Sequence, residues 1–178
     1  MKTMNKKQAQ EEVKTSFERA VSVRRVTKVT KGGKRFAFSA FVISGDGQGN
    51  VGIAIGKGRD VSIAISKATV KAGKTRIHVP LYGTTVPYNV EGTHGACKVV
   101  ICSASKGTGI VAGGSVRAVM ESIGVKDVLT KSFGASNSIN VVKATLNALS
   151  KLRSAKHIAK LRGKTIQELM RGQNVATK

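Results

Sequence analysis

Apolar residues alternate with small or polar residues over the first third of the chain, a pattern typical of β-strands. The alternation is clearest at residues 51–56, residues 34–44 are strand-like, and residues 21–31 are rich in β-branched side chains. The segments between them, 31–34 and 45–50, are built from Gly, Asp, Asn and Lys, which suit turns with positive φ. Three consecutive antiparallel strands are therefore predicted.

Apolar residues recur at helical spacing both before and after these strands. Residues 59–74 form the first strong helical pattern, whose Lys67, Lys71 and Lys74 fall opposite its apolar stripe. The buried stripe is predicted to contain Val61, Ala64, Ile65, Ala68 and Ala72. Residues 8–20 also have helical spacing, but they carry enough charge to be an arm that orders only on a partner.

A second group of elements follows a loop around Pro80 and Pro87. Apolar patterning predicts two strands around a turn, then a helix, a strand and a second helix. Their expected positions are 86–90 and 96–102 around the turn at 92–95, then 114–124, 126–133 and 138–152. Thr165 and Glu168 have the spacing of a capping box and predict one more short helix.

Together the elements predict an α+β protein with two domains. Residues 16–79 form an αβββα domain in the order typical of double-stranded-RNA-binding domains, which read shape, phosphates and 2′-hydroxyls. Residues 84–160 form a ββαβα two-layer sandwich. A basic arm at residues 1–15 and a basic extension at residues 161–178 complete the predicted organisation.

Charge indicates the kind of partner. The 178 residues include 31 Lys and Arg against 9 Asp and Glu, a net charge of +22 with a pI near 10.6. The ends are the most basic parts, because residues 1–35 carry eleven basic and three acidic side chains and residues 143–178 carry nine and one. Such an imbalance is typical of proteins that bind a polyanion.

Other partners and compartments fit less well. The first residues have no apolar core for a signal peptide, and no apolar run is long enough to cross a bilayer, so a cytosolic protein is expected. Binding to a membrane surface would need large apolar anchors on an amphipathic helix, and residues 8–20 offer only Val13 and Phe17. No membrane partner is therefore predicted.

Cysteines, histidines and carboxylates do not form a reactive constellation. Cys97 and Cys102 lie five residues apart in one predicted strand, so they should point to opposite faces and act as buried small hydrophobes. His78, His94 and His157 are widely spaced without other ligands nearby, and two of them are expected in solvated turns. Without a Gly-x-Ser-x-Gly elbow either, the chain is expected to be neither an enzyme nor a metal protein, with no small-molecule substrate.

A glycine loop imitates a nucleotide-binding motif. Gly107, Gly109 and Gly113 precede a predicted helix, but their spacing is one residue longer than the dinucleotide fingerprint. Asp127 lies twenty positions on, at the start of the next apolar run and not at its carboxyl end, where a ribose would be held. Residues 52–58 imitate a triphosphate loop without the magnesium-binding hydroxyl. We expect no cofactor here, but a tight turn that lets backbones approach closely.

Residues 34–41 resemble the RNP1 motif of RNA-recognition domains. They depart from it at Arg35, where Gly is expected, and at Ser39, where Val is expected. That fold needs a helix between its first two strands, whereas three strands are predicted here without one. Phe36 and Phe38 are therefore expected to pack in the core beneath the following helix, although on a strand they could instead stack on bases.

Five separated motifs carry a more specific resemblance. They lie in the order and positions found in the family of the fifth protein of the bacterial small ribosomal subunit, and the resemblance covers residues 16–160. The motifs are residues 26–33, 45–52, 55–57, 107–114 and 138–142. Ser103 and Ser138 stand where that family often has Pro, and Gly58 where it usually has Ala, which affects local loop geometry.

The resemblance implies a structural constituent of the small subunit that binds ribosomal RNA, supports assembly and accuracy, and has no cofactor. It implies a place near the spectinomycin site and the path by which messenger RNA enters. Its implied RNA-binding residues are Arg24, Arg25, Val26, Thr27, Lys28, Lys31, Gly32, Gly33, Lys34, Arg35, Lys57 and Arg59. Its implied contacts with the fourth small-subunit protein are Gly107, Gly109, Gly113, Gly114 and Arg117. The C-terminal segment is implied to face the eighth.

Overall fold

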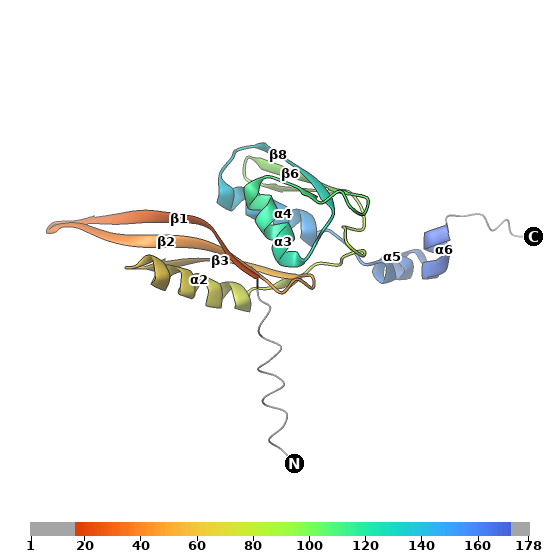
Figure 1. Cartoon of the computed structure of the whole chain (residues 1–178), viewed down its shortest axis with the longest axis horizontal. Coiled ribbons are helices and arrows are strands. Elements are labelled where there is room, and N and C mark those ends of the chain that lie inside the picture. The colour runs from red at the N-terminus through yellow and green to blue at the C-terminus, as the bar shows by residue number, and fades with distance from the viewer. Residues whose placement is uncertain (1–16, 172–178) are drawn as a thin grey trace, which may run out of the picture.

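Two four-stranded sheets organise the chain, and helices cover or separate them (Figure 1). A computed structural model describes residues 17–171. Its elements are β1 Phe17–Thr30, β2 Gly33–Gly45, β3 Asn50–Gly58, α2 Val61–Lys74, β4 Ile77–His78, β5 Val90–His94, β6 Cys97–Ser103, β7 Ile110–Val111, α3 Gly114–Ile123, β8 Val128–Gly134, α4 Ser138–Ser150, α5 Ala155–Arg162 and α6 Ile166–Arg171.

The sheets divide the fold into a first and a second unit. The first sheet has the order β1-β2-β3-β4 and is antiparallel throughout. The second has the order β5-β6-β8-β7, and only the β7–β8 pair is parallel. Helix α2 covers one face of the first sheet, while α3 and α4 lie between the two sheets (Figure 1). The prediction of an α+β protein with two domains is confirmed.

From Ala40 to Gly45, strand β2 is buried on both faces because each face packs against a different partner. Ala40 and Val42 cluster with Ala64 and Ala68 of α2. Phe41 and Ile43, which alternate with them along β2, belong to the larger cluster that joins both units. The period of two along a strand thus divides one apolar run between two cores.

Helix α2 approaches the first sheet closely because the facing row of β3 is small. A Cβ atom on Gly52 would lie 2.1 Å from the carbonyl oxygen of Ala72, and one on Gly56 would lie 2.2 Å from that of Ala64. Ala64, Ala68 and Ala72 are buried as predicted, whereas Val61 of the predicted stripe is exposed and Ile65 is half-buried. Only the narrow alanine stripe fits against the sheet.

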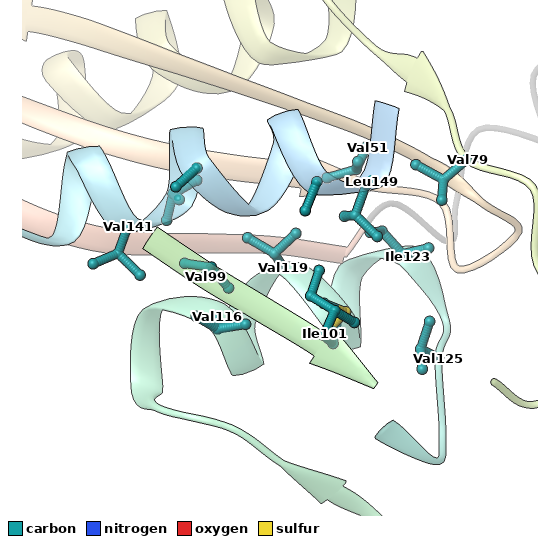
Figure 2. Close-up of a cluster of buried hydrophobic side chains, with 14 of the residues drawn as sticks. Val51, Val79, Val99, Ile101, Val116, Val119, Ile123, Val125, Val141 and Leu149 are labelled. Atoms are coloured by element: carbon teal, nitrogen blue, oxygen red, sulfur yellow. The ribbon is translucent and has the colours of Figure 1, made fainter. Parts of the chain in front are cut away.

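A seam joins the two units where the β2–β3 loop meets the carboxyl end of α3. The Gly47 amide donates to the Ser122 carbonyl at 3.1 Å, and the Gly49 amide donates to the Ile123 carbonyl at 2.9 Å. A Cβ atom on Gly45 would lie 2.0 Å from the Ser122 oxygen. Figure 2 shows the apolar cluster beside this seam, which contains Val51 from the first unit and Leu149 from the second.

Two predicted elements are wrong in part. Residues 17–20 belong to β1 and not to a helix, and the rest of that predicted helix lies outside the described residues. The strand predicted at 86–90 begins only at Val90, and most of the predicted turn at 92–95 is strand β5. Gly92 is not a turn residue: a Cβ there would lie 2.2 Å from the Ala144 carbonyl, so glycine lets α4 contact the strand.

Three short elements were not anticipated: β4, β7 and α5. Strands β4 and β7 have two residues each, too few for a period to be visible. Helix α5 begins after Ser154, whose side chain accepts a hydrogen bond from the His157 amide. The predicted capping box at Thr165 and Glu168 is present, with both of its reciprocal hydrogen bonds.

The seam predicts a steric effect at Gly45. Replacing Gly45 with Ala should lower the free energy of unfolding by about 1–3 kcal/mol, the usual cost of overpacking, because the new methyl group would push the two units apart. Urea unfolding of the full chain would measure the change.

Gly73→Ala is the matched control. Gly73 lies in α2, where a Cβ meets nothing within 4 Å, so alanine should raise stability by up to about 1 kcal/mol through helix propensity. Equal stability of the Gly45→Ala chain and the wild type would contradict the tight seam.

Candidate nucleic-acid interface

The ends of β1 and β2 project as a two-stranded ribbon beyond α2 and the second unit (Figure 1). We call residues 24–38 the arm. Strand β3 ends at Gly58, opposite Phe38, so beyond that point only β1 and β2 pair. A tight turn closes the arm, where Gly33 has φ +121° and the Thr30 hydroxyl donates to the Gly33 carbonyl at 3.1 Å.

The register of β1 and β2 distributes cations over both faces of the arm. Residues directly opposite each other in an antiparallel pair share a face. One face therefore presents Arg24, Lys28, Arg35 and, from β3, Lys57, and the other face presents Arg25 and Lys34. Lys31 lies in the turn. All seven side chains are exposed.

The segment from Arg19 to Gly45, which includes the arm, contains seven Lys or Arg residues and no Asp or Glu. No carboxylate within this segment therefore offsets its positive charge. The predicted RNA-binding residues Thr27, Gly32 and Gly33 are also exposed on the arm. Arg59 lies at its base, in the connection from β3 to α2. The structure therefore brings together the predicted set, from Arg24 to Arg59, along the arm and around its base.

Phe36 corrects one expectation. Phe38 packs against the alanine cluster under α2, as predicted, but Phe36 is 51% exposed. The two rings point to the same face, yet Phe36 lies beyond the last residue pair between β2 and β3. The expectation that both rings pack in the core is therefore correct for Phe38 and wrong for Phe36.

A second basic surface follows the exposed face of α2. Lys67, Lys71 and Lys74 line a shallow depression of about 390 Å³ around Val70, which is 62% exposed. Helical spacing predicted that these lysines share the solvent side. No pattern in the sequence predicted the depression, because it depends on a single residue, Val70, that lies among these lysines.

The glycine loop between β6 and β7 is held by an internal carboxylate. Asp127, only 4% exposed, accepts hydrogen bonds at 2.9 Å from the Gly107 amide and at 3.0 Å from the Gly109 amide. A hydrogen bond from the Thr84 side chain and then one from the Gly109 amide lower the pKa of the Asp127 carboxyl below its ordinary value. The amides that could have bound a phosphate therefore bind a side chain.

The loop also lacks the strand-to-helix geometry of a phosphate site. Strand β7 separates Gly109 from the first residue of α3, Gly114. Phosphate-binding loops instead place their amides at the helix N-terminus itself. Asp127, judged by sequence to be misplaced for a ribose, has a structural role at the loop.

Glycine serves a different purpose here from the one expected. Gly107 and Gly109 have φ of +94° and +76°, so they are needed for left-handed backbone and not for close packing. A Cβ on Gly107, Gly109, Gly113 or Gly114 would meet nothing within 4 Å. The expected close approach of backbones within the chain is therefore wrong at this loop.

An open groove of about 470 Å³ lies beside the loop. Its walls include β7, Gly113, Arg117 and residues 130–132 of β8. Arg117 is fixed across the groove by a 2.8 Å hydrogen bond from its Nη2 to the Ile110 carbonyl. The predicted protein-contact residues Gly113 and Arg117 thus line one concave surface, while Gly107 and Gly109 lie in the preceding loop.

The remaining candidate ligands are dispersed. His78, His94 and His157 are exposed, but they lie in β4, β5 and α5, so the expected turn placement is wrong. Cys97 is buried as predicted and Cys102 is half-buried. Within residues 17–171, no three His, Cys, Asp or Glu side chains are grouped as metal ligands would be. Every helix in that range is too short or too polar to span a bilayer.

These features define a class of protein: a basic two-domain α+β protein with a projecting two-stranded arm that is rich in Lys and Arg. Comparison with known families then identifies it. The chain belongs to the ribosomal protein S5 family, since residues 17–80 match the family model for its N-terminal domain and residues 92–162 match that for its C-terminal domain. The recognition from five separated motifs is confirmed.

Individual relatives agree over most of the chain. A protein of Flavobacterium psychrophilum is 50% identical over 155 residues, which are 87% of this chain and 89% of the relative. One of Lawsonia intracellularis is 50% identical over 151 residues, 85% of this chain and 93% of the relative. Both are named small ribosomal subunit protein uS5. On this ground, the expectation that the chain is not an enzyme is confirmed.

Asp127 predicts a pH-dependent contribution to stability. A carboxyl whose pKa is lowered by folding stabilises the native state above its unfolded pKa, about 4, and this contribution is lost as the pH falls through the lower native value. Asp127→Asn should therefore lower the thermal midpoint at neutral pH, and the difference from wild type should shrink below about pH 4. Calorimetry across that range would measure it.

Glu91→Gln provides the control, because Glu91 is a surface carboxylate whose partner is Lys98. It should change the midpoint little at any pH, as exposed ion pairs contribute little. If the Asp127 variant kept the wild-type midpoint at neutral pH, the carboxylate would not be holding the loop.

Proposed function

We propose that this protein is a structural constituent of the small ribosomal subunit of a bacterial cytosol and binds ribosomal RNA. The single observation that carries the proposal is the arm, a projecting ribbon with cations on both faces. Family membership and the names of the bacterial relatives support the ribosomal setting. The net charge of +22 supports a nucleic-acid partner.

Because the arm carries cations on both faces, we expect it to insert between two RNA segments and not to bind along a single segment. Lys28 and Arg35 lie opposite each other on one face, whereas Lys34 points to the other face. A ribbon that entered a gap between two RNA segments could contact phosphates on both sides at once. Phosphate contacts of this kind fix position without reading base sequence.

The same proposal includes the finer placement that the family resemblance implies. The arm contacts RNA beside the spectinomycin site, and the protein lies near the path by which messenger RNA enters. The groove around Gly113 and Arg117 contacts the fourth small-subunit protein, and its concave shape and the open space beside Gly113 support this contact. The C-terminal segment faces the eighth protein.

RNA affinity should depend steeply on salt. For duplex DNA each neutralised phosphate contributes about −0.9 to the slope of log affinity against log salt, and about −0.7 for single strands. Replacing Lys28, Lys31 and Lys34 together with Ala should make the slope shallower by about two to three units, if each binds a phosphate. Filter binding of the full chain to small-subunit ribosomal RNA of a relative's bacterium would measure it.

A matched control removes three exposed lysines of the second unit: Lys126, Lys131 and Lys143. It has the same net charge as the arm variant. If both triple variants lost the same slope, binding would follow net charge and the arm would not be the RNA-binding element.

The groove predicts a contact that added bulk should disturb. Gly113→Gln should leave the isolated chain folded, because Gly113 has φ −65° and its Cβ direction is open. It should weaken association with the fourth small-subunit protein, measured by calorimetry with the purified partner. Gly109 is less suitable, since its φ of +76° would strain any side chain.

Gly73→Gln, in an open position on α2, is the control for added bulk. Undiminished association of the Gly113 variant would exclude the groove as the docking surface.

A further inference from the structure

A cation and an aromatic ring face each other across the arm. The Cζ atom of Arg25 on β1 lies 4.7 Å from the centroid of the Phe36 ring on β2. Arg25 pairs with Phe38 in the register and is thus the diagonal neighbour of Phe36, within reach on the same face. A guanidinium at this distance is attracted to the ring and restricts how the ring turns.

The exposed part of the Phe36 ring contributes nothing to the stability of the fold. About half of the Phe36 residue is exposed to solvent, and it lies past the end of β3. An ordinary solvated ribbon position would suit a polar residue. Instead the position holds an aromatic ring with the Arg25 guanidinium over it, and the ring's residue pairs with Thr27, directly opposite on β1.

The charges around the ring indicate what would cover it. Arg25 and Lys34 share its face, and Lys28 and Arg35 lie on the reverse face of the same narrow ribbon. An apolar peptide or a lipid tail would bring no negative charge to these cations. A nucleotide brings both a flat base for the ring and a phosphate for the cations.

We propose that the Arg25–Phe36 pair is a stacking platform for an unpaired base of ribosomal RNA. This inference rests on the proposed function and names the RNA feature that the arm recognises. The base must be unpaired, because the faces of bases inside a duplex are already covered by their neighbours. The ring supplies the stacking surface, and Arg25 orients the ring and places a charge near the adjoining phosphate.

A fluorescent oligonucleotide tests the platform with the full chain. The probe is a single-stranded octaribonucleotide of uridines with one central 2-aminopurine, whose fluorescence falls when it stacks. Phe36→Leu should weaken binding by about five- to 150-fold, the range for losing one base–aromatic stack, and should abolish the quenching. The salt slope should stay unchanged, because no cation is removed.

Conservative variants distinguish stacking from other losses. Phe36→Tyr should keep affinity and quenching, since it keeps the ring. Arg25→Lys should keep the salt slope but lose part of the quenching, because an ammonium group cannot stack flat on the ring. Binding of the same sequence annealed to its complement should be unaffected by Phe36→Leu.

Phe133→Leu is the matched control, because Phe133 on β8 is also 51% exposed. Equal weakening in this variant would overturn the platform. So would unchanged affinity and quenching in a folded Phe36→Leu chain, while wild-type binding to small-subunit ribosomal RNA would leave the proposed function standing. Failure of the wild type to bind that RNA at all would remove both.

Discussion

The rest of the structure depends on the contact between the β2–β3 loop and the last turn of α3. The final carbonyls of a helix have no partner within the helix. Here the first unit supplies partners from outside, through the amides of Gly47 and Gly49. A helix of the second unit is thus completed by a loop of the first. Because Gly45 and Gly124 leave no room for a side chain, the contact also fixes the distance between the units.

This contact determines where the arm points. Strand β2 begins at the arm and ends at Gly45, so one continuous strand runs from the tip of the arm to the seam. Residues 40–43 are packed on both faces: Ala40 and Val42 cluster with α2, and Ile43 belongs to the larger core shared by the two units. The free end is therefore the extension of a rigid element. The cations it carries hold positions set by strand register and not by a flexible loop.

Periodicity in the sequence was sufficient for elements with a clear apolar face. Strand β2 and helices α2, α3 and α4 were found because their buried residues recur at fixed spacing. Gly92 was misread because glycine marks a turn in most sequences, whereas here it admits a helix. Phe36 was misread because alternation indicates which face a side chain points to, but not where the covering element ends.

The candidate sites, like the fold, could be predicted from the sequence only in part. The basic residues of the arm could be chosen from sequence because charge, turn residues and family motifs coincide there. That they divide between two faces required the register of β1 against β2. The role of Asp127 could not be read from spacing, because its contacts with Gly107 and Gly109 arise only when β7 and β8 lie side by side.

The internal carboxylate at Asp127 also affects how the neighbouring groove can associate with another molecule. Binding partners usually lose conformational entropy when a loop becomes ordered at an interface. The glycine loop is already tied to the second sheet by Asp127, and Arg117 is already tied to Ile110. Much of that entropy is thus lost during folding and not during association. A glycine-rich loop would otherwise be among the most costly to immobilise, and these internal hydrogen bonds restrict it before any partner binds.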